Sequence, residues 1–375
     1  MNILSVGNTS LDPNLGSGKT RLAWSHGFKS HGHTVKTITP ASFYKPWPLN
    51  KAMRLKMRLD AIKLEKKILN GKYDLVEFYG AEFGLLIDKL SRIPRSKRPL
   101  LVAHTDGLEL LAAQSVKFQI CETTQPLIER SAARIVAPFI SRIDHLAFSR
   151  ADCFVTGCRA DLNFLVSNQI QDADRCAVIE PGIDETFLKA PWRRNKKQMI
   201  VSLASWTLRK DPATTIRVVT ELLRQITDLE FHVIGAPDAK TSILSAFAES
   251  LRPRIVVYPR LTQDEIVAVL SQAKVFLFPS FYEGFGMATT ESMACGCAVV
   301  VTPTGFGESI RDGFDGFVCN FQDSTAMIQR CMSLILDDKL RERLANAGRE
   351  QVCDLSWPAQ VSKLVDRYNI WIKSL

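Results

Sequence analysis

The segment Lys274–Val318, with the sequence KVFLFPSFYEGFGMATTESMACGCAVVVTPTGFGESIRDGFDGFV, decides the fold class of this protein. An apolar run at Val275–Phe278 ends at Pro279, and a second apolar run follows at Ala298–Thr302. Between them lie a glycine-rich stretch and a helical pattern. Two strands that are separated by a helix pair in parallel through a crossover connection. The segment therefore predicts a strand–loop–helix–strand unit of an α/β sheet.

The same alternation of apolar runs and helical patterns continues on both sides of this segment. The other predicted strands lie at 2–6, 35–39, 73–78, 100–103, 153–156, 177–179, 199–204, 231–234 and 255–257. A chain of 375 residues is also long enough for two domains. We therefore predict the fold class α/β, with two Rossmann-like, doubly wound domains that face a cleft. Ligands of such sheets bind at the carboxyl ends of the strands.

The domain boundary is predicted in the stretch 181–198, PGIDETFLKAPWRRNKKQ, which contains two prolines and a basic cluster and has no sustained periodicity. The predicted bounds are 1–183 for the first domain, 184–198 for a linker and 199–356 for the second domain. A last helix at 357–375 is expected to pack back toward the first domain.

The composition is typical of a globular protein, with 46% hydrophobic and 23% charged residues. The start, MNILSVGNTS, has no basic flank followed by an apolar core, so we expect no secretory signal. The longest uncharged stretch, Ser292–Gly307, is interrupted by glycines and a proline, so we expect no membrane span. The nine cysteines have no C-x2-C spacing, which favours buried thiols in a reducing cytosol over a zinc site or a disulfide scaffold.

Positive charge is concentrated in the first part of the chain. The formal net charge is +9, and residues 19–98 contain 18 Lys or Arg but only 6 Asp or Glu. A helix predicted at 52–69 has two apolar stripes separated by Lys and Arg, which favours packing on both sides. Peripheral contact of this region with an anionic membrane stays open as an alternative. Because the basic region lacks a recognised motif of interleaved aromatic and basic residues, we expect no nucleic-acid binding.

The stretch 16–20, GSGKT, resembles the end of a P-loop. That motif requires a glycine where Pro13 stands, and proline has no N–H group to donate to a phosphate. The P-loop interpretation is therefore rejected. A glycine-rich turn between a strand and a helix still lets a ligand approach the backbone, so Gly16 and Gly18 are candidate binding residues.

Two glutamates flank the start of the helix in the segment quoted first. Glu283 precedes the glycines, and Glu291 follows eight positions later. On one helix they would lie about 12 Å apart along the axis, whereas the carboxylates of a hydrolytic pair lie roughly 5 to 9.5 Å apart. The spacing favours two separate contacts, such as one with a ribose and one with a hexose. Two surface glutamates near a turn are the alternative.

Several motifs of this chain resemble the family 4 glycosyltransferases, which are retaining enzymes of the GT-B fold. The similarity is specific in the second domain and looser in the first. The motifs are Glu283-x7-Glu291, SMACG at 292–296, VVVTPTGFGE at 299–308, RDGFDGFV at 311–318, Gly32-His33, ADCFVT at 151–156 and IEPGID at 179–184. The resemblance implies that the first domain binds the acceptor and the second binds a nucleotide-sugar.

The resemblance also implies roles for single residues. Glu291 would bind the ribose hydroxyls of the donor nucleotide. Glu283 would contact the donor sugar, beside the backbone amides of Phe285 and Gly286. Lys210, in SWTLRKD, corresponds to the lysine that neutralises the leaving diphosphate.

In the first domain, Gly16 and Gly18 would line the phosphate side of the donor, and His104 would lie near the donor sugar and the reacting centre. A structural histidine is the alternative for His104. The family arginine that clamps the diphosphate is replaced here by Ser205, and a serine hydroxyl cannot form a bidentate pair. The neighbouring Arg209 is a candidate to reach the same phosphates.

These features predict a retaining glycosyltransferase that moves a hexose from a nucleoside-diphosphate sugar to a glycan, a lipid-linked compound or another hydroxyl acceptor. A cell-envelope glycan is an expected product. We expect no cofactor and no metal, because cationic side chains would stabilise the leaving group. The expected location is the cytoplasm, with peripheral contact at the inner face of the membrane as an open alternative.

Two other functions stay open. The replacement by Ser205 is compatible with a weak or inactive GT-B protein that binds glycan or nucleotide-sugar as a partner subunit. A nucleotide-sugar epimerase or a phosphorylase on the same fold is the second alternative.

Overall fold

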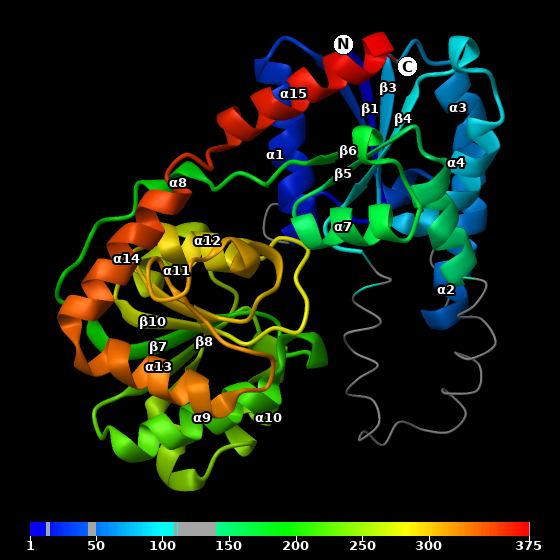
Figure 1. Cartoon of the computed structure of the whole chain (residues 1–375). Coiled ribbons are helices and arrows are strands. Elements are labelled where there is room, and N and C mark those ends of the chain that lie inside the picture. The colour runs from blue at the N-terminus through cyan, green and yellow to red at the C-terminus, as the bar shows by residue number, and fades with distance from the viewer. Residues whose placement is uncertain (13–15, 44–49, 109–110, 112–139, 375) are drawn as a thin grey trace. The chain divides into compact units, whose positions relative to one another are not determined.

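The computed structural model describes residues 1–12, 16–43, 50–108, 111 and 140–374 (Figure 1). The chain divides into two compact units. The first contains Met1–Pro181 and Trp357–Leu375, and the second contains Gly182–Ser356. Each unit contains one six-stranded parallel sheet with helices packed against it. The predicted α/β fold with two Rossmann-like domains is confirmed, and the cleft between them stays a prediction.

In the first unit the strand order is β2-β1-β3-β4-β5-β6, and all paired strands run parallel. The strands are β1 (Asn2–Gly7), β2 (Thr34–Ile38), β3 (Leu75–Tyr79), β4 (Leu100–Thr105), β5 (Cys153–Thr156) and β6 (Cys176–Val178). The helices are α1 (Gly16–Ser30), α2 (Asn50–Ala61), α3 (Glu65–Leu69), α4 (Gly84–Ser91), α7 (Arg159–Ser167) and α15 (Trp357–Ser374). The central strand β3 is buried on both faces, as a near-continuous apolar run predicts.

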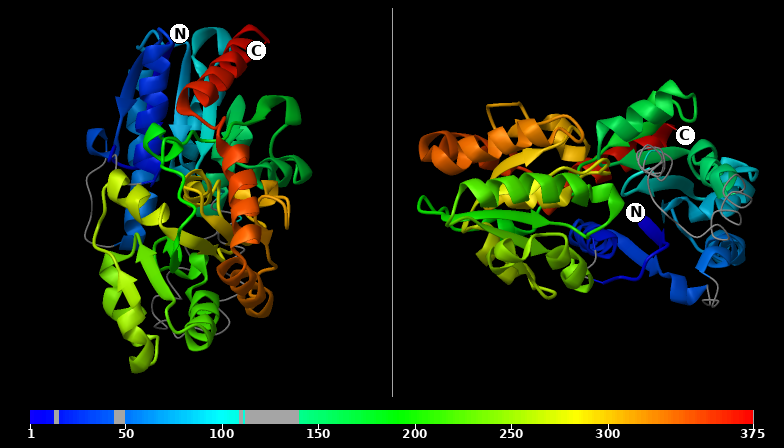
Figure 2. Two further views of the ribbon diagram at one scale, coloured as in Figure 1. Left: turned by 90° about the vertical axis from the view of Figure 1, so that its left-hand side faces the viewer. Right: turned by 90° about the horizontal axis from the view of Figure 1, so that it is seen from below.

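Helices cover both faces of this sheet. On one face α1 and α15 lie side by side, where Trp24 packs edge-on against Trp357 at 5.1 Å between ring centres (Figures 1 and 2). On the other face, the core contains Leu64 and Ile68 from the α2–α3 region, together with residues of α4 and α7. The last helix of the chain is therefore part of the first unit.

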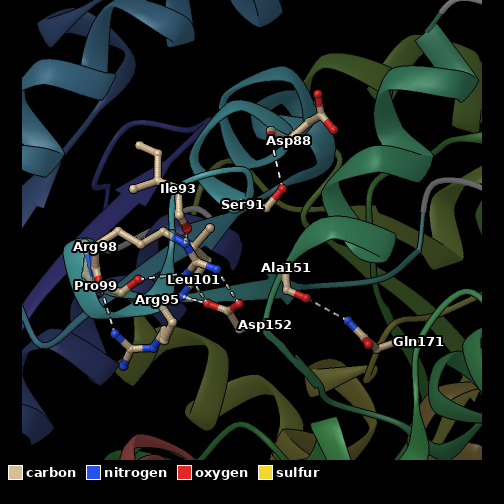
Figure 3. Close-up of polar contacts among 10 residues, drawn as sticks. All are labelled: Asp88, Ser91, Ile93, Arg95, Arg98, Pro99, Leu101, Ala151, Asp152 and Gln171. Carbon is tan, nitrogen blue, oxygen red and sulfur yellow. Dashed lines mark hydrogen bonds and ion pairs between the residues drawn. The ribbon is translucent and has the colours of Figure 1, made fainter. Parts of the chain in front are cut away.

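An ion pair fixes the start of β4 beside β5 (Figure 3). The Arg98 guanidinium, whose side chain is only 5% exposed, donates to both oxygens of Asp152 at 2.5 and 2.8 Å. Asp152 also accepts from the backbone N–H of Leu101 at 2.8 Å. A bidentate pair of this kind sets the geometry of both partners. Arg98 thus belongs to the interior of the unit and not to its charged surface.

In the second unit the strand order is β12-β11-β10-β7-β8-β9, again parallel throughout. The strands are β7 (Lys197–Leu203), β8 (Glu230–Ile234), β9 (Ile255–Val257), β10 (Ala273–Phe278), β11 (Ala298–Val301) and β12 (Phe317–Val318). The helices are α8 (Glu185–Leu188), α9 (Pro212–Gln225), α10 (Lys240–Ser245), α11 (Gln263–Leu270), α12 (Met287–Ala294), α13 (Ser324–Leu336) and α14 (Asp338–Val352). Helices α9, α10 and α13 contribute to the core on one face, and α8, α11 and α12 to the core on the other.

The predicted linker 184–198 differs from the structure. It contains α8 and the first residues of β7, and it lies within the second unit. Phe187 and Ala190 are buried in the core of that unit, and the Ala190 carbonyl accepts from the Arg349 guanidinium at 2.6 Å. Two apolar side chains three positions apart are too weak a pattern to be detected among prolines and charges.

A group of buried polar side chains joins α15 to the first sheet. The hydroxyl of Tyr368, on α15, donates to Oε1 of Glu77 on β3 at 2.6 Å. Nε2 of His104, on β4, lies 2.6 Å from the same hydroxyl, and the His104 ring stacks on Tyr79 at 4.4 Å. The single hydroxyl hydrogen goes to Glu77, so Nε2 of His104 is the donor to the Tyr368 oxygen. Together these bonds give a hydrogen-bond partner to three buried polar groups that water cannot reach.

Tyr368→Phe removes the hydroxyl that serves both Glu77 and His104. Because a buried carboxyl and a buried imidazole then lack this partner, we expect the free energy of unfolding to fall by about 1–3 kcal/mol. Urea-induced unfolding followed by circular dichroism measures the change. Ile370→Ala, at a 54% exposed position of the same helix, is the control and should stay within about 0.5 kcal/mol of the parent. An unchanged Tyr368→Phe variant would show that the bonds do not stabilise the unit.

Candidate functional site

Two loops of the second unit meet at the carboxyl ends of β7 and β10, which are neighbours in the sheet. The first loop contains η7 (Leu208–Lys210), and the second leads from β10 to α12. Nζ of Lys210 lies 2.5 Å from Oε1 of Glu283, and Nη1 of Arg209 lies 3.3 Å from Oε2. Nη1 of Arg209 also donates to the Tyr282 carbonyl at 2.8 Å. Two cations therefore converge on one carboxylate.

Local backbone structure sets the position of Lys210. The next residue, Asp211, has a left-handed conformation with φ +47°, and its carboxylate accepts from the Thr214 N–H at 3.0 Å as the N-cap of α9. This cap ends η7 and begins α9. Nζ of Lys210 lies 4.6 Å from the ring centre of Phe278, the last residue of β10. Burial lowers the pKa of Lys210, and the Glu283 carboxylate opposes that shift.

Glu283 is held by a loop that follows β11. Its backbone N–H donates to Oγ1 of Thr304 at 2.8 Å, and the Phe306 N–H donates to the Phe285 carbonyl at 2.5 Å. A side chain at Gly305, where φ is +57°, would meet that carbonyl at 2.5 Å. Thr304 and Gly305 were not predicted as site residues. Both lie in the VVVTPTGFGE run, whose similarity to the family is the signal that could have identified them.

The second glutamate lies on α12. Gly286 has φ +85° and is the residue from which α12 begins, so its freedom from a side chain permits the sharp entry into the helix. Phe285 is 7% exposed and packs edge-on against Phe306 at 5.7 Å. Glu291 is in the middle of α12 and is also 7% exposed. Glu283 precedes the helix, so the two carboxylates belong to different elements, as the sequence indicates.

The structure thus brings Arg209, Lys210 and Glu283 into direct contact. Phe285 and Gly286 follow Glu283 in the same loop, and Glu291 follows on α12. All six lie in the second unit. The two cations, which contact the loop before α12, are suited to binding an anion, and the two carboxylates can accept hydrogen bonds from hydroxyl groups.

The remaining predicted residues lie in the first unit. Gly16 is the first residue of α1. At Gly18 a side chain would lie 2.7 Å from the Ser10 carbonyl and 2.8 Å from the Asp12 backbone, so the chain itself packs closely on this glycine. His104 is 4% exposed, near the end of β4. Their roles toward a ligand stay predictions.

Burial shifts the pKa values of His104 and Glu77, the two partners of Tyr368, in opposite directions. Burial lowers the pKa of His104 to about 3, so the imidazole is neutral at ordinary pH. Burial raises the pKa of Glu77 to about 7, while the Tyr368 hydrogen bond and the charge of Arg21 work against that rise. A neutral His104 is suited to a positioning role and does not supply a proton.

Three further expectations concern metals, thiols and membranes. Among the described residues, no group of three or more His, Cys, Asp or Glu side chains is arranged to hold a metal ion. Eight cysteines in the described part of the chain are free thiols, and seven of these are buried. The ninth, Cys121, lies outside the described residues. Within the ranges described above, no helix combines the length and apolar character needed to span a membrane.

Comparison with known proteins agrees with the motifs. Residues 184–351 match the family glycosyl transferases group 1. A D-inositol 3-phosphate glycosyltransferase of Salinispora arenicola is 26% identical over 246 residues, which cover 59% of this chain and 55% of the relative. Another, of Corynebacterium efficiens, is 25% identical over 322 residues, which cover 80% of this chain and 71% of the relative. The chain therefore spans about half the length of the first relative.

Solved structures share the fold at low identity. Sucrose-phosphate synthase from Thermosynechococcus elongatus superposes with a TM-score of 0.78 at 15% identity, covering 100% of both chains. HepE from Anabaena, in complex with UDP, superposes with a TM-score of 0.71 at 14% identity, covering 99% of this chain and 100% of the other. These likenesses confirm the GT-B fold, and with the family match they confirm the resemblance to glycosyltransferases.

Glu77 and His104 give the first unit opposite pH dependences. The folded state keeps the Glu77 proton up to about pH 7, whereas the unfolded state releases it near the ordinary carboxyl pKa of 4.5. This contribution to the free energy of unfolding is therefore lost as pH rises between these values. The unfolded state protonates His104 below about 6.5 and the folded state does so only near 3, so that contribution is lost as pH falls. Between about pH 4.5 and 6.5 the two groups change the free energy of unfolding in opposite directions as the pH rises.

Substituting either residue should reveal the pH dependence that the other residue gives to the free energy of unfolding. Relative to the parent, Glu77→Gln should gain stability with rising pH, and His104→Gln should lose stability with rising pH, each by up to about 1.4 kcal/mol per pH unit. Urea unfolding at several values between pH 4.5 and 6.5 measures both. Curves that run parallel to the parent for both variants would contradict the assignment.

Proposed function

Because residues 184–351 match the family glycosyl transferases group 1, we propose that this protein is a retaining glycosyltransferase. It would move a hexose from a nucleoside-diphosphate sugar to a hydroxyl group of a glycan, a lipid-linked compound or another acceptor. The observation that supports this proposal most directly is the convergence of Lys210 and Arg209 on the carboxylate of Glu283, at the start of α12.

The donor would occupy the second unit. Lys210 and Arg209 would face the diphosphate, and the largely buried Lys210 ammonium would act on it more strongly than a solvated charge does. Glu283 would accept hydrogen bonds from the hexose hydroxyls and Glu291 from the ribose hydroxyls. UDP is the first nucleotide to test, since HepE was solved with it.

The chemistry needs no protein nucleophile. The bond between the anomeric carbon and the diphosphate oxygen would break through an oxocarbenium-like transition state. The acceptor oxygen would then bond to the same face of that carbon, and its proton would pass to the departing diphosphate oxygen. Lys210 and Arg209 would stabilise the negative charge that develops on the leaving group. The proposal includes no metal and no cofactor, and the neutral His104 would act by position only.

The acceptor would bind to the first unit. The basic region 19–98 suits an anionic or lipid-linked acceptor. Because two relatives are named D-inositol 3-phosphate glycosyltransferase, we would test D-inositol 3-phosphate first as the acceptor. A cytoplasmic location with peripheral contact at the membrane belongs to the same proposal, and so does a product in a cell-envelope glycan.

One observation favours a second candidate. Ser205 is exposed and occupies the position of the family arginine, which is compatible with a partner subunit that binds a nucleotide-sugar without turnover. A screen of UDP-, GDP- and ADP-sugars for nucleotide release, with and without membrane extract, separates the two functions. Nucleotide binding without release across the screen would support the subunit, and epimerised donor without any acceptor would support an epimerase.

Glu291→Gln and Glu283→Gln test the two sugar contacts. Each loses a charged hydrogen-bond acceptor worth about 1.5–3 kcal/mol, so kcat/KM for the donor should fall about ten- to hundredfold. Glu249→Gln, at a 90% exposed carboxylate, is the matched control and should leave kcat/KM unchanged. If Glu291→Gln transfers sugar as fast as the parent, the ribose contact is wrong.

Arg209 is proposed to replace the family arginine. Arg209→Ser should therefore lower kcat/KM about ten- to hundredfold, because one charged partner of the diphosphate is lost. Adding Ser205→Arg to that variant should restore activity, since it returns a guanidinium to the family position. The comparison of the single and double variants isolates the diphosphate contact. A double variant as inactive as Arg209→Ser would show that the two positions are not equivalent.

A further inference from the structure

Three buried polar groups of the first unit form one hydrogen-bonded chain. The Tyr368 hydroxyl oxygen lies 2.6 Å from Oε1 of Glu77 and 2.6 Å from Nε2 of His104. Nε2 and Oε1 are themselves 3.4 Å apart, which is long for a hydrogen bond. The carboxyl group therefore reaches the imidazole through the hydroxyl. All three residues are buried, so water has little access to these bonds.

The His104 ring is held in place by two aromatic side chains. It stacks on the Tyr79 ring at 4.4 Å and meets the Tyr368 ring edge-on at 6.3 Å, between ring centres. In the part of the chain that the structure describes, Nε2 is bonded to Tyr368 and Nδ1 has no hydrogen-bond partner. Nδ1 is therefore the ring nitrogen that can meet a ligand.

The hydrogens of this chain can be arranged in two ways. A neutral imidazole has one N–H donor and one acceptor nitrogen, and an ionised carboxylate only accepts. When Glu77 is ionised, the Tyr368 hydroxyl donates to Oε1, Nε2–H of His104 donates to the Tyr368 oxygen, and Nδ1 carries a lone pair.

The second arrangement contains one more proton. When Glu77 is protonated on Oε1, its O–H donates to the Tyr368 oxygen, and the Tyr368 hydroxyl donates to Nε2 of His104. The imidazole hydrogen is then on Nδ1. Each hydrogen has moved one place along the chain, the imidazole is neutral in both arrangements, and no heavy atom has to move.

We propose that Glu77 is a positioning residue that sets which ring nitrogen of His104 carries the hydrogen. Its ionised form makes Nδ1 a hydrogen-bond acceptor, and its protonated form makes Nδ1 a donor. Tyr368 transmits the change, because a hydroxyl with a single hydrogen donates to one neighbour and accepts from the other. The carboxyl group thus acts on a ligand through His104 without touching it.

The surroundings of Glu77 bring its ionisation to neutral pH. Burial raises the pKa of Glu77 to about 7, while the Tyr368 hydrogen bond and the charge of Arg21, on α1, work against that rise. Tyr79 on β3 and Ser5 on β1 also favour the ionised form. Both arrangements are therefore populated in the range where most enzymes work.

The neighbours of the chain do not take over this titration. Burial lowers the pKa of His104 to about 3, so the ring stays neutral. Burial raises the pKa of Tyr79 and of Tyr368, which therefore keep their hydroxyl hydrogens. Cys153, which faces Tyr368 from β5, also has a pKa raised by burial and stays a thiol.

This inference deepens the proposed function and rests on it for its effect on catalysis, because His104 is proposed to lie near the donor sugar. With Glu77 ionised, Nδ1 accepts from a sugar hydroxyl, and the negative end of the chain strengthens that bond. The same charge favours an oxocarbenium-like transition state. We expect kcat/KM for the donor to rise about two- to tenfold as the pH rises through about 7.

The test is a nuclear magnetic resonance titration of the full chain labelled with ¹⁵N-histidine. Long-range ¹H–¹⁵N correlations separate a ring nitrogen that carries hydrogen from one that carries a lone pair, and the His104 signals are those that disappear in His104→Gln. We expect the Nδ1–H form at low pH and the Nε2–H form at high pH, with a midpoint near pH 7.

A second histidine is the internal reference. Nε2 of His232 lies 2.9 Å from Oε2 of Glu230, and Nδ1 lies 2.9 Å from the Tyr258 hydroxyl. Because Glu230 is an exposed carboxylate, it accepts from Nε2–H, and Nδ1 accepts from the hydroxyl. Whenever this ring is neutral, it should stay in the Nε2–H form.

Two variants should abolish the change at His104. Glu77→Gln has no carboxyl proton to lose, and Tyr368→Phe lacks the hydroxyl that joins the two groups. Asp106→Asn is the control, since Asp106 is another carboxylate near Arg21 and is not bonded into the chain. This control should keep the change of tautomer, and circular dichroism confirms that each variant is folded.

The same variants separate the positioning role from the proposed function. In the pH profile of kcat/KM, the step near pH 7 should be absent in Glu77→Gln and present in Glu249→Gln, at a 90% exposed carboxylate. If the His104 tautomer changes as expected while no donor sugar releases nucleotide, the positioning role stands and the proposed function fails.

Four results would overturn the inference. The first is a His104 tautomer in the parent that stays constant between about pH 5.5 and 8.5. The second is a His104 ring with hydrogen on both nitrogens below pH 7. The third is a change of tautomer that persists in Tyr368→Phe. The fourth is a Glu77→Gln enzyme whose pH profile keeps the step of the parent.

Discussion

The contact of Lys210 and Arg209 with Glu283 is the interaction on which the site of the second unit depends. It joins the loops after β7 and β10, two strands whose parallel pairing brings their carboxyl ends to one edge. The two cations compensate the negative charge of Glu283, so the carboxylate can be largely buried. The carboxylate in turn keeps the two cations close together before any ligand binds. Preorganised charges of this kind cost no rearrangement at the moment when a leaving group becomes negative.

Much of the fold could be predicted because each sheet is parallel and buried on both faces. Such strands are nearly continuous apolar runs, and the run at Val275–Phe278 recurs in the structure as the end of β10. The predicted linker at 184–198 failed for the opposite reason. Its contribution to the core consists of few side chains, chiefly Phe187 and Ala190, among prolines and charges that suggest solvent.

The site was predictable in part for a similar reason. Lys210, Glu283 and Glu291 belong to short motifs whose spacing is visible in the chain, whereas the bond from Glu283 to Thr304 depends on how a third loop folds back. The surroundings of His104 were beyond sequence reasoning altogether. Its partner Tyr368 is 264 positions away and reaches β4 only because α15 packs on the first sheet. No local pattern encodes a contact of that range, and the burial that lowers the pKa of His104 cannot be recognised in the sequence either.

The basic region shows the same limit for charge. A count of 18 basic against 6 acidic residues in 19–98 states how much charge is present but not where it points. In the structure, Arg21, Arg58 and Arg98 are turned inward, while the acidic partners of Lys63, Lys89 and Arg92 lie beneath them. The orientation of the charged side chains therefore determines the charge of this surface more than their number does.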